Sequence, residues 1–159
     1  MNIRIIAVGK LKQKYLINGT AEYLKRLQAY AKIDVCEVKE ENFMEPLNKR
    51  QIEIIKEKEA ERIQTLIPER YYIISLDRRG KQLSSMQFAK KLENLAVYQQ
   101  GNAAFIIGGP LGLAESLIGQ SDFVLSFSLF TFPHQLMRLV LMEQIYRSLT
   151  IIRNEKYHK

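Results

Sequence analysis

Short apolar runs alternate with longer amphipathic stretches along the chain. Five runs rich in branched and aromatic residues read as buried strands: residues 3–8, 33–38, 71–76, 103–107 and 123–127. Between and after them, apolar side chains recur at helical spacing or follow helix-start signals, which predicts helices over residues 21–30, 48–67, about 84–95, 113–118 and 133 to about 149. This alternation predicts an α/β fold with a mostly parallel sheet and helices on both faces.

Local signals refine these boundaries. Pro68 ends the long helix before it, and Ser84 or Ser85 caps the helix that carries Phe88. Cys36, inside the second strand, is interpreted as a small core residue. No repeat or flexible linker divides the chain, so we expect one domain over residues 1–159.

Composition narrows the class of protein. The 159 residues are 47% hydrophobic and 26% charged, as in an ordinary globular domain. A single cysteine excludes a disulfide scaffold, and neither a signal peptide nor a membrane helix is visible. We therefore expect a cytoplasmic protein with no membrane partner.

The net charge of +7 favours a polyanionic partner such as nucleic acid. The basic residues cluster around positions 10–14, around 78–81 and after 138, and none lies between Lys91 and Arg138. Each cluster also fits an ordinary solvated surface. The charge alone leaves these alternatives open.

Ligands of open α/β sheets bind outside the carboxyl ends of the strands, where three segments draw attention: residues 76–81, 106–113 and 126–134. The turn at residues 108–112 is rich in glycine but matches neither a Walker loop nor a dinucleotide fingerprint, so it is also consistent with a plain tight turn. The segment 127–132 holds four large apolar residues, which fits a pocket wall for a flat ligand or a buried crossing segment. His134 opens the last helix, where capping or packing is the favoured role. Two separated histidines and one cysteine supply no metal site.

Taken together, these segments resemble the large-subunit ribosomal RNA pseudouridine N3-methyltransferases of the SPOUT superfamily. The resemblance covers essentially the whole chain. It is carried by Ala7-Val8-Gly9-Lys10-Leu11-Lys12, Leu76-Asp77 with Gly80-Lys81, Ile107-Gly108-Gly109-Pro110 with Gly112-Leu113, Leu125-Ser126 with Ser128, Thr131, Pro133-His134 and Arg138, and Tyr157-His158-Lys159.

The resemblance implies a C-terminal trefoil knot within a SPOUT-like domain, with the knotted cofactor-binding region at about 71–159. It implies S-adenosylmethionine (S-adenosyl-L-methionine) as the cofactor and no metal. By motif match, the cofactor-binding residues are Leu76, Gly108, Phe127, Ser128, Leu129, Phe130, Thr131 and Phe132. Arg78-Arg79 and Leu129-Phe130 depart from the expected pattern without removing a motif position.

The resemblance also implies a homodimer that methylates N3 of a pseudouridine in 23S ribosomal RNA within the assembled 70S ribosome. We hypothesise that the tail of one subunit closes over the target base. Arg138, Tyr157 and His158 are then the catalytic candidates, with His158 or Arg138 assisting loss of the N3 proton. The alternatives are a tail that only contacts phosphate, and an inactive ribosome- or RNA-binding protein of the same fold.

Overall fold

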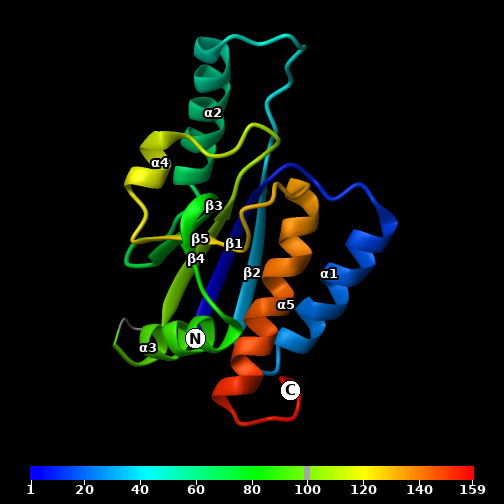
Figure 1. Cartoon of the computed structure of the whole chain (residues 1–159), viewed down its shortest axis with the longest axis vertical. Coiled ribbons are helices and arrows are strands. Elements are labelled where there is room, and N and C mark those ends of the chain that lie inside the picture. The colour runs from blue at the N-terminus through cyan, green and yellow to red at the C-terminus, as the bar shows by residue number, and fades with distance from the viewer. Residues whose placement is uncertain (99–100) are drawn as a thin grey trace.

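A computed structural model, which describes residues 1–98 and 101–159, contains one five-stranded, all-parallel sheet in the order β2-β1-β4-β3-β5 (Figure 1). Its strands are β1 Asn2–Val8, β2 Lys32–Val38, β3 Tyr72–Gln82, β4 Asn102–Ile107 and β5 Phe123–Ser126. Its helices are α1 Lys14–Leu27, α2 Lys49–Gln64, α3 Ser85–Tyr98, α4 Glu115–Gly119 and α5 His134–Ile152. The predicted α/β class and the parallel sheet are confirmed.

Each face of the sheet is covered by helices. Ile3, Ile5 and Ala7 of β1 face a core shared with α1, α3 and α5, whereas Ile6 and Val8 face a second core shared with α2 and α4. The alternation follows from the two-residue period of a strand. Because both faces are buried, β4 is apolar from Ala103 to Ile107 and reads as one continuous run.

Helix α1 begins at Lys14, seven residues before the predicted start, and ends at Leu27 rather than at residue 30. Gly19 lies inside the helix because α5 packs closely there: a Cβ on Gly19 would lie 3.1 Å from the Leu139 side chain. A tertiary contact therefore explains a residue that reads locally as a helix breaker.

Strand β3 is longer than predicted and includes the residues expected to form a loop after Leu76. Its ladder with β5 breaks between Leu76 and Lys81 and then resumes, so that Lys81 and Gln82 still pair with β5. Gly80 allows this return, because a Cβ there would lie 2.6 Å from the Val124 carbonyl oxygen. The polar segment 77–82 is thus held against the sheet.

The other elements begin and end close to their predicted limits. Ser84 is the cap of α3: its Oγ accepts from the Gln87 amide, and the Gln87 side chain accepts from the Ser84 amide. Cys36 is only half-buried, because β2 is an edge strand. No helix of the described residues is long and apolar enough to cross a membrane. The trefoil knot stays a prediction.

Candidate active site

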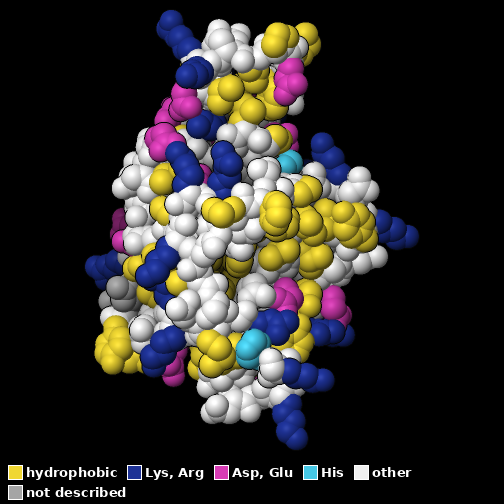
Figure 2. All heavy atoms as spheres, viewed as in Figure 1, with side chains coloured by type: hydrophobic (Ala, Val, Ile, Leu, Met, Phe, Trp, Pro, Cys, Tyr) yellow, Lys and Arg dark blue, Asp and Glu magenta, His cyan; other side chains and the backbone are white. Residues whose placement is uncertain are grey.

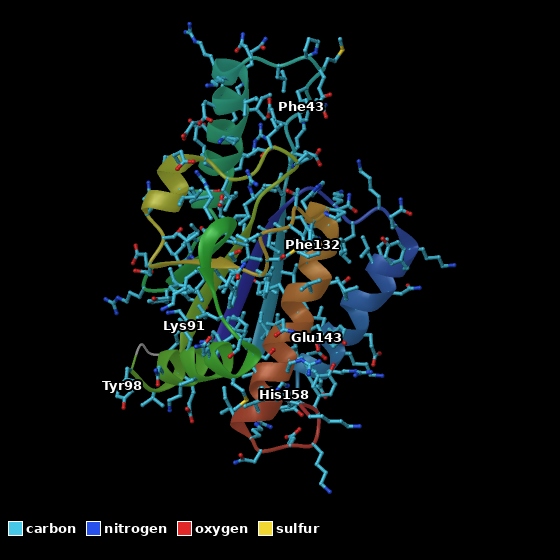
Figure 3. All side chains as sticks on the ribbon, viewed as in Figure 1. Phe43, Lys91, Tyr98, Phe132, Glu143 and His158 are labelled. Atoms are coloured by element: carbon cyan, nitrogen blue, oxygen red, sulfur yellow. The ribbon has the colours of Figure 1, made fainter. Side chains whose placement is uncertain are left out.

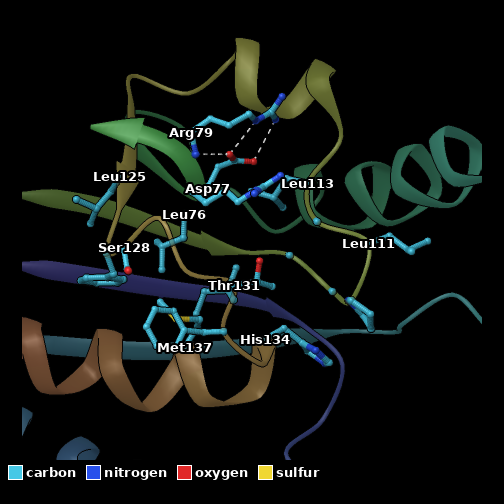
Figure 4. A pocket seen from close by; sticks show the side chains of 18 of the residues that line it. Leu76, Asp77, Arg79, Leu111, Leu113, Leu125, Ser128, Thr131, His134 and Met137 are labelled. Atoms are coloured by element: carbon cyan, nitrogen blue, oxygen red, sulfur yellow. Dashed lines mark hydrogen bonds and ion pairs between the residues drawn. The ribbon is translucent and has the colours of Figure 1, made fainter. Parts of the chain in front are cut away.

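A cleft of about 420 Å³ opens at the carboxyl ends of β3, β4 and β5 (Figure 4). Its apolar walls include Leu76, Leu125, Phe127 and Met137, and its polar lining includes Asp77, Arg79, Glu115, Ser128 and Thr131. The cleft therefore fits a ligand that combines a flat apolar part with polar groups.

The glycine turn after β4 brings main chain directly to the cleft. Gly108 lines it, and a Cβ there would lie 2.9 Å from the carbonyl carbon of Gly112. Gly112 has φ near +86° and its amide donates to the Gly109 oxygen at 3.0 Å, which closes the turn. The turn is therefore tight and also exposes main chain to a ligand.

The end of β3 is tied to the helix on the opposite rim. Arg79 donates to the Asp77 carboxylate at 2.9 and 3.1 Å, and its Nη2 lies 2.8 Å from Glu115 Oε1 at the start of α4. The hydrogen bonds from Arg79 lower the pKa of Asp77. Both acids belong to the rim of the cleft, although the sequence singled out neither as a site residue.

The loop before α5 divides the predicted cofactor residues. Phe127, Ser128, Phe130, Thr131 and Phe132 line the cleft, as do Leu76 and Gly108 from the other two strand ends. Leu129 does not line it, and 78% of this residue is exposed. The loop is shaped by Ser128, whose Oγ accepts from the Phe130 amide at 3.1 Å and whose carbonyl accepts from Ser126. That turn directs residue 129 away from the cleft.

His134 lines the cleft and does not cap the helix; Pro133 takes the N-cap position, and no side chain caps the first turn. Its Nε2 is buried 4.0 Å from Glu40 Oε2 and has no hydrogen-bond partner among the residues that the structure describes. Burial lowers the pKa of the imidazole more than the nearby Glu40 raises it. His134 is therefore a neutral side chain at neutral pH.

Arg138 lies outside the cleft, one turn further along α5. Its side chain is 3% exposed, forms an ion pair with Glu37 of β2, and donates to the Gly9 carbonyl at 2.8 Å. In this subunit Arg138 therefore holds α5 against the ends of β1 and β2. The geometry gives no support to a contact between Arg138 and a ligand in the cleft.

His158 lies beside the second half of α5, away from the cleft (Figure 3). Tyr157 Oη donates to Glu143, and His158 Nδ1 lies near Arg147. These two helix residues come six and ten positions after Met137, the last residue of α5 that lines the cleft, which is about 9 and 15 Å along the helix at 1.5 Å per residue. Within one subunit the structure thus brings seven of the eight predicted cofactor residues together and leaves the catalytic candidates apart from them.

Met137 and Lys56 also line the cleft and were not expected there, for different reasons. Met137 stands three residues after His134, so helical spacing could have placed both on one face. Lys56 reaches the cleft from α2, and nothing in the local sequence indicates this. No group of three potential metal ligands occurs in the part of the chain that the structure describes.

Comparison with known proteins defines the class. A family model described as predicted SPOUT methyltransferase matches residues 1–158. The chain belongs to the SPOUT methyltransferase family, and the predicted resemblance is confirmed. As a methyltransferase it requires a methyl donor, which the cleft is suited to hold.

The relatives specify the branch of the family. Proteins named ribosomal RNA large subunit methyltransferase H, from Finegoldia magna and Listeria welshimeri, are each 52% identical to this chain, over the full length of both chains. The protein of that name from Bacillus thuringiensis is 53% identical over the same length. A solved structure of a probable methylase family protein from Haemophilus influenzae superposes with a TM-score of 0.50 at 13% identity, covering 96% of this chain and 66% of that one. This last likeness concerns the fold alone.

Proposed function

We propose that this chain uses S-adenosylmethionine to methylate N3 of a pseudouridine in 23S ribosomal RNA of the assembled 70S ribosome. The observation that carries the proposal is the full-length similarity to large-subunit ribosomal RNA methyltransferases, joined to a cleft built from the three segments that the motifs mark. We propose one domain over residues 1–159, with a knotted cofactor-binding region at about 71–159, acting in the cytoplasm, where ribosomes are.

The residues of the cleft fit S-adenosylmethionine. Leu76, Leu125 and Phe127 would enclose the adenine ring, and the main chain at Gly108 would offer its polar groups to the ring edge. Asp77, Ser128 and Thr131 provide polar partners for the remaining part. When bound, the cofactor supplies a methyl group on a positively charged sulfur, which a well-aligned nucleophile attacks without a metal.

Activation of the nucleophile, N3 of the target base, requires a protein group in addition to the cofactor. N3 of a uracil-like base carries a weakly acidic proton, and the base must lose it to attack. A hydrogen-bond donor or positive charge near the base favours the anion. The candidates Tyr157 and His158 could supply such groups, but in their own subunit they contact Glu143 and Arg147, beyond the part of α5 that lines the cleft.

A homodimer resolves this separation. Figure 2 shows a broad apolar patch on the face formed by α1 and the N-terminal half of α5. The exposed large apolar residues of α1 and of the loop before α5 are Tyr15, Ile17, Leu129, Phe130 and Phe132. Such patches mark interaction sites. If two α5 helices pack antiparallel across this face, the tail of one subunit lies near the cleft of the other.

Ribosomal RNA would meet exposed basic residues around that composite site. Lys10, Lys12 and Lys14 follow β1, and Arg78 and Lys81 lie on the polar end of β3. Both clusters follow strand ends on the side of the sheet where the cleft opens, and the pairing doubles the +7 charge. Binding should therefore weaken as salt rises.

The decisive test compares methyl transfer from labelled S-adenosylmethionine to assembled ribosomes and to free ribosomal RNA, with mass mapping of the product. We expect one methylated pseudouridine in the 23S RNA of ribosomes and little in free RNA. Modification of another base would refute the assigned target. Calorimetry with S-adenosylmethionine distinguishes a methyltransferase from an inactive ribosome-binding protein of the same fold. No binding at high cofactor concentration would indicate the inactive protein.

Mixed dimers test whether the tail acts on the partner's cleft. One variant lacks residues 157–159 and keeps the cleft; the other carries Gly108→Ala and keeps the tail. At an S-adenosylmethionine concentration far below the dissociation constant of the Gly108→Ala cleft, each variant alone is expected to have little activity. Random mixing makes half the dimers mixed, each with one complete site, so roughly a quarter of wild-type activity should return. No recovery, with mixed dimers verified by mass spectrometry, would contradict action across the dimer.

A further inference from the structure

The C-terminal tail is docked on its own subunit by a polar network along the middle and second half of α5. Glu143 Oε1 accepts hydrogen bonds from Arg147 Nε at 3.0 Å, Arg147 Nη2 at 2.5 Å and Tyr157 Oη at 3.1 Å. Tyr157 Oη also lies 3.3 Å from Tyr23 Oη of α1. One carboxylate thus organises an arginine of the helix and a tyrosine of the tail.

Packing reinforces this arrangement. The Tyr157 ring stands edge-to-face on Tyr146 with centroids 4.8 Å apart, and the Arg147 guanidinium lies 4.8 Å from the Tyr157 centroid. Burial raises the pKa of Tyr157, so this phenol keeps its proton and remains a donor to Glu143. Tyr30 donates to Glu155 and fixes the start of the tail. His158, the residue after Tyr157, therefore extends from a segment of the tail that is already held in place.

The next contact determines the chemistry of His158. Arg147 Nη1 lies 3.3 Å from His158 Nδ1. A guanidinium has donors only, so Nδ1 must accept. A neutral imidazole that accepts at Nδ1 carries its proton on Nε2. The ring nitrogen that remains for a substrate is consequently an N–H donor with no free lone pair.

We infer that Arg147, held by Glu143, fixes His158 in the Nε2–H form, and that His158 donates a hydrogen bond to a carbonyl oxygen of the target base and is not the group that accepts its proton. The inference rests on the proposed function. N3 lies between two carbonyl groups, and the negative charge left by its proton spreads onto their oxygens. A donor at one oxygen stabilises that anion.

The step balances without a protein base. The N3 proton passes to solvent water, the electron pair left on N3 forms the bond to the methyl carbon, and the carbon–sulfur pair remains on sulfur. His158 is unchanged at the end. Arg147 and Glu143 act through His158 and are positioning residues.

Nitrogen NMR of the whole protein labelled in its two histidines reads the tautomer directly. We expect an unprotonated Nδ1 and a protonated Nε2 for His158 at a pH where the ring is neutral, with His158→Gln used for assignment. Arg147→Met should shift the signals toward those of a free histidine mixture, whereas the nearby Arg153→Met should not. A proton on Nδ1 of His158 in the wild type would overturn the inference.

Kinetics test the donor role. The amide of His158→Gln can place an N–H where Nε2–H stands, but it is not a base at neutral pH. We expect this variant to stay within about tenfold of wild-type kcat, and His158→Ala to lose about a hundredfold or more, as when a single oxyanion donor is removed. Equal losses in both variants would overturn the donor role. The NMR result needs no substrate, so a wild type that fails to methylate ribosomes would refute the proposed function and leave the tautomer standing.

Discussion

Replacing Gly108 by alanine tests whether the turn after β4 forms the cofactor site. The added Cβ would lie 2.9 Å from the carbonyl carbon of Gly112, 3.0 Å from its oxygen and 3.1 Å from Leu113 Cδ2. Two of these neighbours are main chain, so the turn itself must move. Overpacking of this kind costs about 1–3 kcal/mol. If this cost applies to the conformation of the turn that binds the cofactor, the affinity for S-adenosylmethionine drops about 5- to 150-fold.

The assay is calorimetric titration with S-adenosylmethionine, alongside thermal unfolding to verify the fold. Gly119→Ala is the matched control, because a Cβ there meets nothing within 4 Å and the residue closes a short helix at ordinary φ. This control should bind as the wild type does. A folded Gly108→Ala protein with unchanged affinity would refute the assignment of this turn to the cofactor.

Three further predictions address other parts of the molecule. Arg138→Met should lower the free energy of unfolding by about 2–4 kcal/mol in urea titrations, because it leaves the partly exposed Glu37 carboxylate without its partner. Arg26→Gln, which removes an exposed ion pair, should leave the urea midpoint unchanged. Equal effects of the two substitutions would contradict a structural role for Arg138. Because burial lowers the pKa of His134 in the folded protein, its contribution to stability is fully present above the unfolded pKa of about 6.5 and is lost as the pH falls through the folded pKa. His134→Gln should therefore lose less free energy of unfolding between pH 7.5 and pH 5 than the wild type does. An identical pH profile in the two proteins would be inconsistent with this. Leu129→Asp should raise the dissociation constant of the proposed dimer by ~100-fold or more in analytical ultracentrifugation, while the affinity for the cofactor stays unchanged. An unchanged dissociation constant would show that Leu129 does not belong to the interface.

The strands were predictable because burial on both faces leaves a continuous signal in the sequence. The run from Ala103 to Ile107 is apolar at every position and is buried at every position. The start of α1 was not predictable, because Gly19 is explained by Leu139 of α5, 120 positions away. The polar end of β3 is likewise held by its pairing with β5.

The same distinction applies to the site. Strand ends and glycines identify the cleft, since the carboxyl ends of parallel strands meet at one edge of the sheet. The direction of single side chains depends on local turns and distant partners. Ser128 turns Leu129 outward, and Glu37, 101 positions from Arg138, holds that arginine away from the cleft of its own subunit. Neither partner is recognisable from one sequence.

Helix α5 connects the two halves of the proposed site and is held at two places. Near its start, Arg138 binds the ends of β1 and β2, and at its centre Glu143 binds Arg147 and Tyr157. The spacing between cleft and tail within a subunit is therefore rigid. In the proposed dimer, the approach of His158 to the partner's cleft depends on how the two subunits pack across the apolar patch, so we expect a substitution at Ile17 of that patch to abolish methyl transfer without touching either the cofactor or the base.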